Sequence, residues 1–481
     1  MQTINLDTSS LVWQIFSEIC QIPRPSGQEE KIMQYLNNFA VQHGFLTKTD
    51  TAGNKVLIKP GIQPAIAMQA HTDMVCEKRA DSLHDFQTDP IQSSIEDGWM
   101  KANGTTLGAD NGIGMAMALA AMLQYTGKNQ LETLFTVSEE TGLSGAAAVQ
   151  NGFISAPVLL NLDSEEENEL IVGCAGGCET VAHWDISETD AIKGLFFIEI
   201  SIKGLLGGHS GSDIHLPRAN ALALLTQFLQ QTAQKYPFFL CHIEGGGLHN
   251  AIAREAKALF AIPFAHREHI RIDWNIYTAE LEDLWLQHEP KMRFDLSSRP
   301  EQTKVLTPHL TQSILQALGE CPHGVIAMSS TLADVVETST NLASIKKIDQ
   351  QYVITTSQRS SNEEQLNALA FKVYSLFTEK GATAGISNGY PAWQPQFNSA
   401  LLQTAQKTYQ QLFNKEAKVK IIHAGLECGL FSKAMPTLQL ISFGPTLTGV
   451  HSPDERLNIA STNRMQAFLM LLLKNLSEIS A

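Results

Sequence analysis

Three short apolar runs in the first third of the chain each lead into a histidine or an acidic residue. Each run has the length and apolar content of a strand buried in a sheet, and helical patterns lie before and between the runs. Strands that alternate with helices restrict the chain to a layered α/β domain with a mostly parallel or mixed sheet. In such sheets, functional side chains collect where the strands end. The runs are Ala65–Ala70, Leu131–Val137 and Val158–Leu162.

The middle of the chain has a different pattern from its two ends. Leu195–Lys203 alternates as a half-buried strand does, and two strand-and-helix units of similar size follow it. The segment Ile386–Pro395, rich in Gly, Pro and aromatic residues, is typical of a linker. After it, the alternation of the first part resumes. We therefore predict a discontinuous α/β domain, with a mixed sheet flanked by helices, over residues 1–187 plus 388–481, interrupted by an inserted α+β domain over 188–387.

The composition argues against two classes of partner. Lys and Arg number 34 against 49 Asp and Glu, a net charge of −15, whereas nucleic acids and anionic membranes bind basic surfaces. The longest apolar stretch, Gly112–Leu123, is shorter than the ~20 residues that a membrane-spanning helix needs. The first seven residues lack the basic region of a secretion signal. The seven cysteines are odd in number and spread along the chain, which is typical of reduced thiols and not of a disulfide framework. We expect a cytoplasmic protein with no nucleic-acid or membrane partner.

The motif His71-Thr-Asp73 follows the first apolar run. Its histidine and aspartate stand two residues apart, so in an extended chain both side chains point to the same side. A carboxylate beside an imidazole suits a metal-ligating histidine whose ring is oriented by the acid. The alternative is a plain turn at the strand end, capped by Asp73.

Asp110 stands in the segment GADNGIG, just before a helical pattern of small residues. As a first interpretation, its carboxylate caps that helix. As a second, the three glycines allow the backbone to come close to a ligand, and Asp110 bridges two metal ions with its oxygens. The residue itself leaves both interpretations open.

Glu139 and Glu140 end the second run, and Lys128 is the only basic residue near them. Two carboxylates in one turn repel each other, which raises the pKa of one of them. A divalent ion would relieve the repulsion by binding one glutamate and leaving the other as a general base. The alternative is an acidic turn in solvent.

Asp163 ends the third run, and His451 follows a late strand and a loop containing Gly and Pro. Glu165–Glu167, next to Asp163, is interpreted as a solvated face. The candidate donors supply three ligands to each of two divalent ions if Asp110 is shared. Nitrogen and oxygen donors without a thiolate fit zinc best, with manganese or cobalt as alternatives. The set is His71, His451, Asp110, Asp163 and one of the two glutamates Glu139 and Glu140.

The ordered motifs HTD, GADNGIG, SEETG, NLDSE, GGHSG and a late GVHSPDE resemble those of the co-catalytic di-zinc exopeptidases. Within that family the chain is most similar to the bacterial aminoacyl-histidine dipeptidases, also known as cytosol non-specific or β-alanyl-histidine dipeptidases. The resemblance covers essentially the whole chain. It implies a zinc-exopeptidase-like catalytic domain and an inserted lid domain.

The resemblance also implies a role for each donor. His71 and Asp163 would bind one zinc ion, Glu140 and His451 the other, and Asp110 would bridge them. Asp73 would orient His71. Glu139 would be the general base, which takes a proton from the metal-activated water and later delivers it to the leaving amine.

Four further residues are implied to act near the substrate. In the lid, His209 would polarise the scissile carbonyl, while Asn250 and Arg359 would hold the carboxylate end of the substrate. Glu427 would lie near the site. An arginine suits this task because its guanidinium binds a carboxylate through two hydrogen bonds.

The expected function is that of a zinc-dependent dipeptidase, a metallo-exopeptidase that hydrolyses unblocked dipeptides. Xaa-His dipeptides such as β-alanyl-histidine would be preferred, and the partner would be a small peptide substrate. Related enzymes commonly form homodimers. The alternatives are a tripeptidase or an N-acyl amino acid deacylase with the same metal site, and a binding protein that keeps the fold without the chemistry.

Overall fold

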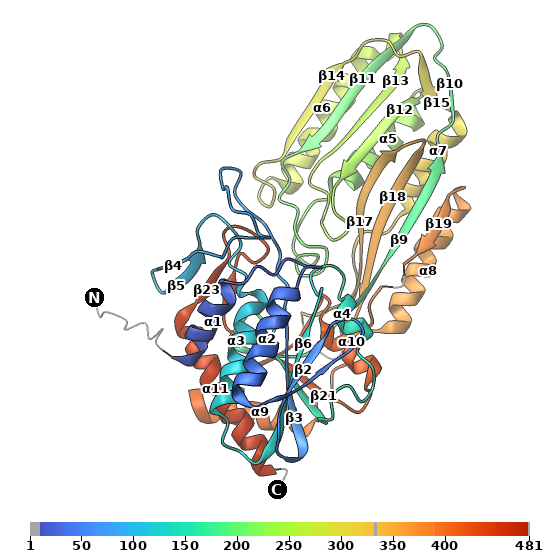
Figure 1. Ribbon diagram of the computed structural model, residues 1–481. Helices are drawn as coiled ribbons and strands as arrows, with labels where there is room; N and C mark the ends of the chain where they lie inside the picture. Colours follow the sequence, from blue (N-terminus) through green and yellow to red (C-terminus); the bar gives the residue numbers. More distant parts are fainter. Residues whose placement is uncertain (1–9, 331–333, 388, 480–481) are drawn as a thin grey trace. The chain divides into compact units, whose positions relative to one another are not determined.

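The computed structural model describes residues 10–330, 334–387 and 389–479 of the chain (Figure 1). The first seven residues, where no secretion signal is expected, lie outside the described part. The chain divides into two compact units, each described here by itself. The first contains Met1–Cys174, Trp393–Ile421 and Leu426–Ala481, and the second contains Ala175–Ala392 and Ile422–Gly425.

The first unit is built on an eight-stranded mixed sheet with the order β1-β2-β6-β3-β7-β21-β8-β20. Its four central strands run parallel to one another, and β1, β2 and β8 pair in the antiparallel sense. The strands are β1 (Leu46–Thr49), β2 (Lys55–Lys59), β3 (Ile62–His71), β6 (Asn129–Thr136), β7 (Val158–Asn161), β8 (Glu169–Cys174), β20 (Lys418–Ile422) and β21 (Gln439–Ser442).

Most helices of the first unit pack around this sheet in an apolar core. The helix α3 lies against β3, and both α1 and α11 lie against α3. Nearly every residue of α3 is buried, as the small and apolar side chains around its whole circumference predict. The helices are α1 (Leu11–Cys20), α2 (Glu30–His43), α3 (Ala109–Gln124), α4 (Ser144–Ala148), α9 (Ala400–Phe413), α10 (Glu427–Ala434) and α11 (Ile459–Ile479).

A small four-stranded antiparallel sheet, with the order β22-β23-β5-β4, belongs to the same unit. It joins a hairpin that precedes α3 to the segment on either side of His451. Its strands are β4 (Ser93–Glu96), β5 (Trp99–Ala102), β22 (Leu447–Thr448) and β23 (Arg456–Asn458).

The second unit contains a nine-stranded sheet in which all the pairs are antiparallel. Its order is β14-β11-β13-β12-β17-β18-β9-β19, and β16 also pairs with β17. The strands are β9 (Gly176–Asp185), β11 (Leu195–Lys203), β12 (Phe239–Gly246), β13 (Ala256–Pro263), β14 (Arg293–Ser298), β16 (Gly324–Met328), β17 (Val336–Ile348), β18 (Gln351–Ser360) and β19 (Thr383–Ile386). A separate pair joins β10 (Glu188–Asp190) to β15 (Lys304–Leu306).

The described residues of this unit also form four α-helices, and the sequence pattern missed one of them. Only four residues of α6 are buried, and they recur at helical spacing among charged residues, so the apolar stripe is narrow: Ile270, Trp274, Tyr277 and Leu281. The helices are α5 (Ala221–Lys235), α6 (Arg267–Trp285), α7 (Pro308–Glu320) and α8 (Glu363–Glu379).

The α/β class with a mixed sheet and an α+β insertion is confirmed, but the contacts place the unit boundaries elsewhere than 188–387. The second unit begins at Ala175 because β9 pairs with β18 on one side and β19 on the other. It extends to Ala392 and takes in Ile422–Gly425. The roles of the units as catalytic domain and lid stay predictions.

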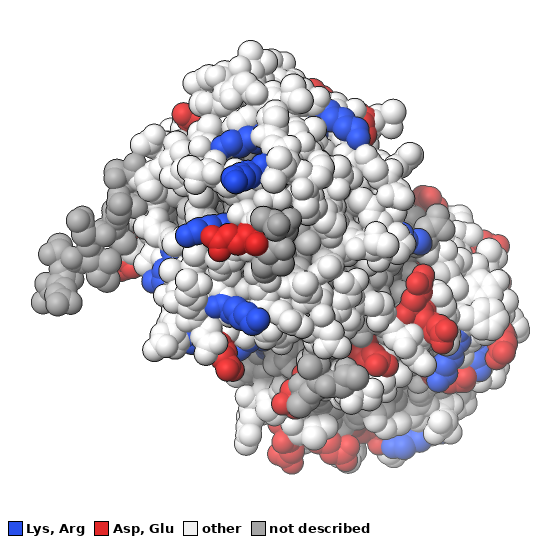
Figure 2. Space-filling model, turned by 90° about the horizontal axis from the view of Figure 1, so that it is seen from below, with Lys and Arg blue, Asp and Glu red and all other residues white. Residues whose placement is uncertain are grey.

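The described helices include none that is long and apolar enough to cross a membrane. All seven cysteines are free thiols. On the face shown in Figure 2, basic and acidic side chains are interspersed among uncharged ones. One sequence expectation about charge needs correction: Glu167, expected on a solvated face, forms a two-point salt bridge with Arg464, at 2.6 Å for each hydrogen bond.

Candidate metal centre

The parallel strands of the first unit bring four predicted site residues to one edge of the sheet. His71 is the last residue of β3, Glu139 and Glu140 follow the end of β6, and Asp163 follows the end of β7. Because β3 lies between β6 and β7 and runs parallel to both, the carboxyl ends of all three strands meet there.

Asp110, in the first turn of α3, and His451, in the connection between β22 and β23, reach the same place. One carboxylate oxygen of Asp110 lies 3.1 Å from Nε2 of His71, and the other lies 3.2 Å from Nε2 of His451. Asp163 Oδ1 is 3.4 Å from His71 Nε2, and Glu140 Oε2 is 3.1 Å from His451 Nε2. Asp110 thus stands between the two imidazoles, each of which has a second carboxylate beside it.

Two of the donor groups that this arrangement forms share Asp110. Donor atoms of His71, Asp110 and Asp163 all lie within 4.8 Å of one another, and so do those of Asp110, Glu140 and His451. A third group of the same kind contains His71, Glu139 and Glu140. The first two groups are the two ligand sets that the resemblance implies, and the third places Glu139 at their side.

Asp73 is completely buried and makes contacts on two sides. Its Oδ1 lies 3.3 Å from Nδ1 of His71, as a residue that orients the ring would. The same carboxylate accepts hydrogen bonds from the backbone amides of Glu139 and Glu140, at 3.0 and 3.1 Å, and from the Ser26 hydroxyl at 2.7 Å. Asp73 therefore neighbours His71 and also caps a turn. The turn that it caps is the one after β6, which carries Glu139 and Glu140.

Buried negative charge dominates the electrostatics of the cluster. Burial raises the pKa of Asp163 to about 6 and raises the pKa of Glu139 well above its usual range, although His71 opposes both shifts. Hydrogen bonds that the His451 imidazole donates to the carboxylates of Asp110 and Glu140 raise the pKa of His451 to about 11. Asp73 behaves in the opposite way: burial by itself would raise its pKa, but contacts with His71, the Ser26 hydroxyl and the Glu139 amide together lower it to about 2.

The cluster fits a pair of divalent ions. Oε1 of Glu140 is buried and has no hydrogen-bond partner among the described residues. An unsatisfied carboxylate oxygen among other buried carboxylates is costly unless a cation faces it. Imidazole nitrogens and carboxylate oxygens are donors that zinc, manganese and cobalt accept.

Two contacts around the cluster were not anticipated from the sequence. Asn111, next to Asp110, donates a hydrogen bond from its amide to Asp163 Oδ1. Glu29 accepts from the backbone amide and the hydroxyl of Ser138, at 2.9 and 3.1 Å, and so holds the turn before Glu139. Asn111 sits inside a quoted motif, but nothing in the sequence around Glu29 pointed to this contact.

Glu427 begins α10 and is completely buried. One of its oxygens accepts hydrogen bonds from the side chains of Gln69 and Thr136, at 2.5 and 2.9 Å, and the other has no hydrogen-bond partner among the described residues. Burial raises its pKa to about 8. Gln69 belongs to β3 and Thr136 is the last residue of β6. Glu427 therefore lies beside the two strands whose ends lead to His71 and the two glutamates.

The other predicted substrate residues belong to the second unit. Nε2 of His209 lies 3.5 Å from one terminal guanidinium nitrogen of Arg359. The other terminal nitrogen donates a 2.5 Å hydrogen bond to the Tyr390 hydroxyl. The carbonyl of Asn250 accepts a hydrogen bond from the amide of Ser210, at 2.7 Å, so it adjoins the His209 turn. The unit therefore brings His209, Asn250 and Arg359 together, and Tyr390 is a neighbour that the sequence did not suggest.

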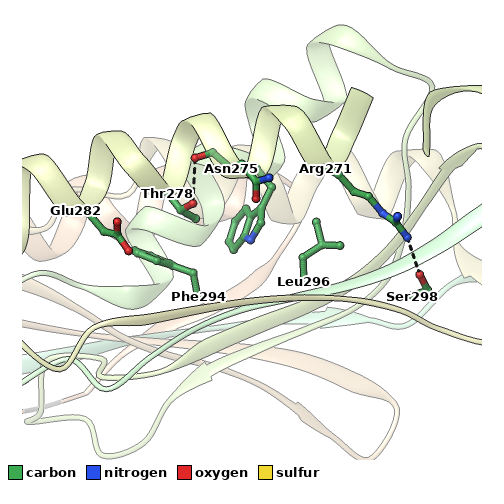
Figure 3. Close-up of a pocket in the computed structure, with 8 residues that line it drawn as sticks. Arg271, Asn275, Thr278, Glu282, Phe294, Leu296 and Ser298 are labelled. Atoms are coloured by element: carbon green, nitrogen blue, oxygen red, sulfur yellow. Dashed lines mark hydrogen bonds between the residues drawn. The ribbon is translucent and has the colours of Figure 1, made fainter. Parts of the chain in front are cut away.

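A separate pocket of the second unit contains none of the predicted site residues (Figure 3). It lies between α6 and β14, where Arg271 donates a 3.3 Å hydrogen bond to Ser298. Its lining mixes apolar and polar side chains: Arg271, Trp274, Asn275, Thr278, Glu282, Phe294, Leu296 and Ser298.

Comparison with known proteins agrees with this geometry. The sequence model of peptidase family M20/M25/M40 matches residues 67–475 of this chain. The cytosol non-specific dipeptidase of Escherichia coli is 38% identical over 471 residues, which are 97% of each chain. The crystal structure of aminoacylhistidine dipeptidase from Vibrio alginolyticus is 36% identical, covers 98% of this chain and 99% of its own, and has a TM-score of 0.85.

A more distant structure shows the fold alone. A tripeptidase from Staphylococcus aureus is 15% identical, with a TM-score of 0.55 over 97% of this chain and 98% of its own. Enzymes of the M20 type typically use two metal ions, and the chain has candidate ligands for them. The chain therefore belongs to peptidase family M20/M25/M40 and is a metallo-exopeptidase of the same kind as its full-length dipeptidase relatives.

Proposed function

We propose that this enzyme hydrolyses unblocked dipeptides in the cytoplasm, with a preference for Xaa-His dipeptides such as β-alanyl-histidine, at a centre of two zinc ions. The observation that carries the proposal is the pair of donor groups that share Asp110. The names of the two full-length relatives, a cytosol non-specific dipeptidase and an aminoacylhistidine dipeptidase, support the substrate class.

In this proposal His71 and Asp163 hold one ion, Glu140 and His451 hold the other, and Asp110 contacts both. Two divalent ions, when bound, lower the pKa of a water molecule and stabilise the negative charge that develops on the scissile carbonyl. Asp73 keeps the His71 ring in place through the contact at 3.3 Å.

Glu139 is the proposed general base. Its carboxylate takes a proton from the attacking water and delivers it to the nitrogen of the leaving amine, which balances the hydrolysis of one amide bond. Burial raises the pKa of Glu139, and a base that must later act as an acid works best when its pKa is near the working pH. Asp73, which accepts hydrogen bonds from both glutamate amides, holds the turn that carries this base.

The second unit supplies the proposed substrate contacts. His209 polarises the scissile carbonyl, and Arg359 with Asn250 binds the free carboxylate of the dipeptide. The hydrogen bond from Arg359 to Tyr390 supports this role because it orients the guanidinium. A homodimer, which the resemblance also implies, is checked by light scattering of the protein in solution.

A substrate panel tests the proposed function. With zinc added, we expect β-alanyl-histidine and simple Xaa-His dipeptides to be hydrolysed with the highest kcat/KM, and a tripeptide and N-acetyl amino acids to be hydrolysed poorly. Release of free amino acid is measured for each substrate. A preference for the tripeptide or the N-acetyl amino acids would contradict the proposal in favour of a tripeptidase or a deacylase.

Removal of divalent ions should abolish hydrolysis and lower Tm, because the buried carboxylates then repel one another without compensation. An ion present at a hundred times its Kd stabilises the folded protein by about 2.7 kcal/mol. Activity and Tm are measured after chelation and again after zinc or calcium is added. Zinc should restore both, and calcium should restore less because it prefers oxygen ligands alone. Undiminished hydrolysis by the chelated enzyme would contradict a metal mechanism.

Arg359→Gln should raise KM for free dipeptides about 10–100-fold with a smaller change in kcat, since a hydrogen bond to a charged group contributes ~1.5–3 kcal/mol. A dipeptide amide, which lacks the carboxylate, should be hydrolysed equally poorly by the wild-type and variant enzymes. The control is Arg299→Gln, which removes an exposed arginine of the same unit that pairs with Glu199. An unchanged KM in Arg359→Gln would remove Arg359 from substrate binding.

A further inference from the structure

Glu455 makes a set of contacts that the proposed mechanism does not use. Its side chain is 2% exposed, although it lies only four residues after His451. One oxygen accepts hydrogen bonds from the backbone amides of Leu107 and Gly108, at 2.6 and 2.9 Å. The other accepts from the amides of Ala109 and Asp110, at 2.8 and 3.2 Å.

Four successive amides that converge on one carboxylate form an anion-binding concavity of the backbone. Here the anion is part of the same chain, 345 residues away from Asp110 in sequence. Hydrogen bonds to a charged group are stronger than those between neutral groups, and burial keeps water from competing for the amides. The segment that carries Asp110 is therefore tied at four points to the segment that carries His451.

The segment around Glu455 is itself well anchored. The amide of Glu455 donates a 3.1 Å hydrogen bond to the carbonyl of Ser452, which closes the turn after His451. β23 begins at the next residue and pairs with β5. The Glu455 carboxylate thus links the segment that carries Asp110 directly to the turn that follows His451, in addition to the pairing of β23 with β5.

Arg24 also binds the segment that carries Asp110. It is 3% exposed and donates hydrogen bonds to the carbonyls of Thr72 and Asp73, at 3.0 and 2.7 Å. A second guanidinium nitrogen donates to the carbonyl of Gly108. Arg24 therefore joins the end of β3 to the segment of Asp110, as Glu455 joins that segment to the segment of His451.

We propose that Glu455 is a positioning residue that holds Asp110 and His451 within reach of one ion, and that it thereby sets the affinity of the Asp110–Glu140–His451 site. Two of the three ligands of that site depend on the Glu455 contacts. The His71–Asp110–Asp163 site depends on them only through Asp110. The inference rests on the proposed two-ion centre.

Zinc titration of the full-length metal-free protein against a chromogenic chelator tests the inference. In Glu455→Gln the amide nitrogen faces backbone N–H donors and cannot accept their hydrogen bonds. We expect the affinity for one of the two zinc equivalents to fall about 10–100-fold, as for other residues that support metal ligands, while the affinity for the other changes by less than about threefold.

Glu132→Gln is the matched control. Glu132 is another buried glutamate of the first unit, and it accepts hydrogen bonds from the backbone amides of Ser155 and Ala156, away from the metal cluster. We expect it to bind both equivalents as the wild type does. The comparison separates a specific effect on the ligand-bearing segments from the general cost of disturbing a buried carboxylate.

The outcomes distinguish the inference from the proposed function. A wild-type protein that binds fewer than two zinc ions contradicts the two-ion centre itself. A wild type that binds two ions, with a Glu455→Gln variant that binds both equally tightly or loses both alike, overturns only the role of Glu455. If circular dichroism shows that Glu455→Gln is unfolded, Glu455→Asp is titrated with the same expectation, because its carboxylate is one methylene too short to reach all four amides.

Discussion

Glu139→Gln is expected to lower kcat for a dipeptide about 10²–10⁴-fold, the usual contribution of a positioned general acid–base group. Glutamine keeps the size and the burial of the side chain but cannot take a proton. Because Glu139 belongs to neither of the two donor groups that share Asp110, the variant should still bind two metal ions. KM should change little, since the loss falls on proton transfer.

Metal content, kcat and KM are measured together on the same preparation of Glu139→Gln. Glu132→Gln is the control, because it makes the same chemical change at a buried glutamate of the same unit. A Glu139→Gln variant that keeps its metal and hydrolyses dipeptides at the wild-type rate would refute the proposed base. A variant that loses its metal would instead make Glu139 a ligand.

Asp110→Ala is expected to weaken metal binding and catalysis together. It removes one ligand from each donor group at once, because its two oxygens face His71 and His451 at 3.1 and 3.2 Å. Metal ions supply several kcal/mol of charge stabilisation, so kcat/KM should fall about 10³-fold or more. Both zinc equivalents should bind more weakly than in the wild type.

Zinc titration and kcat/KM measure this loss, and excess zinc should not restore the rate because Asp110 is the one described residue that belongs to both groups. Asp190→Asn is a suitable control, since Asp190 is an exposed aspartate that pairs with Lys304 on the surface of the second unit. Tight binding of two ions by Asp110→Ala would show that Asp110 is not shared between them.

The clustering of the candidate site residues could be predicted because strands of a parallel sheet present their ends at one edge. His71, Glu139 and Asp163 follow three apolar runs, and the structure has those runs as the adjacent strands β3, β6 and β7. Because these strands are parallel neighbours, the residues that follow them lie close together in space although they are far apart in the sequence. The family and the type of enzyme followed from the order of the motifs.

The sequence was less informative about side chains that form hydrogen bonds to the backbone and take no direct part in the proposed chemistry. Glu455 stands in a quoted motif, yet its contacts with four amides depend on a segment 345 residues away. Arg24 and Glu29 lie outside every motif. The helix α6 was missed because only a narrow stripe of it is buried.

Residue types, their order and the strand ends where they stand are properties of the local sequence, and together with the family resemblance they already predicted a pair of metal ions held by imidazole and carboxylate groups. Which oxygen faces which imidazole depends on segments that meet only after the chain has folded. Asp73 illustrates the difference, because its sequence position admitted a partner for His71 or a cap of a turn, and packing made it both. Such contacts between distant segments follow from the burial of the whole core, so no short stretch of sequence contains them.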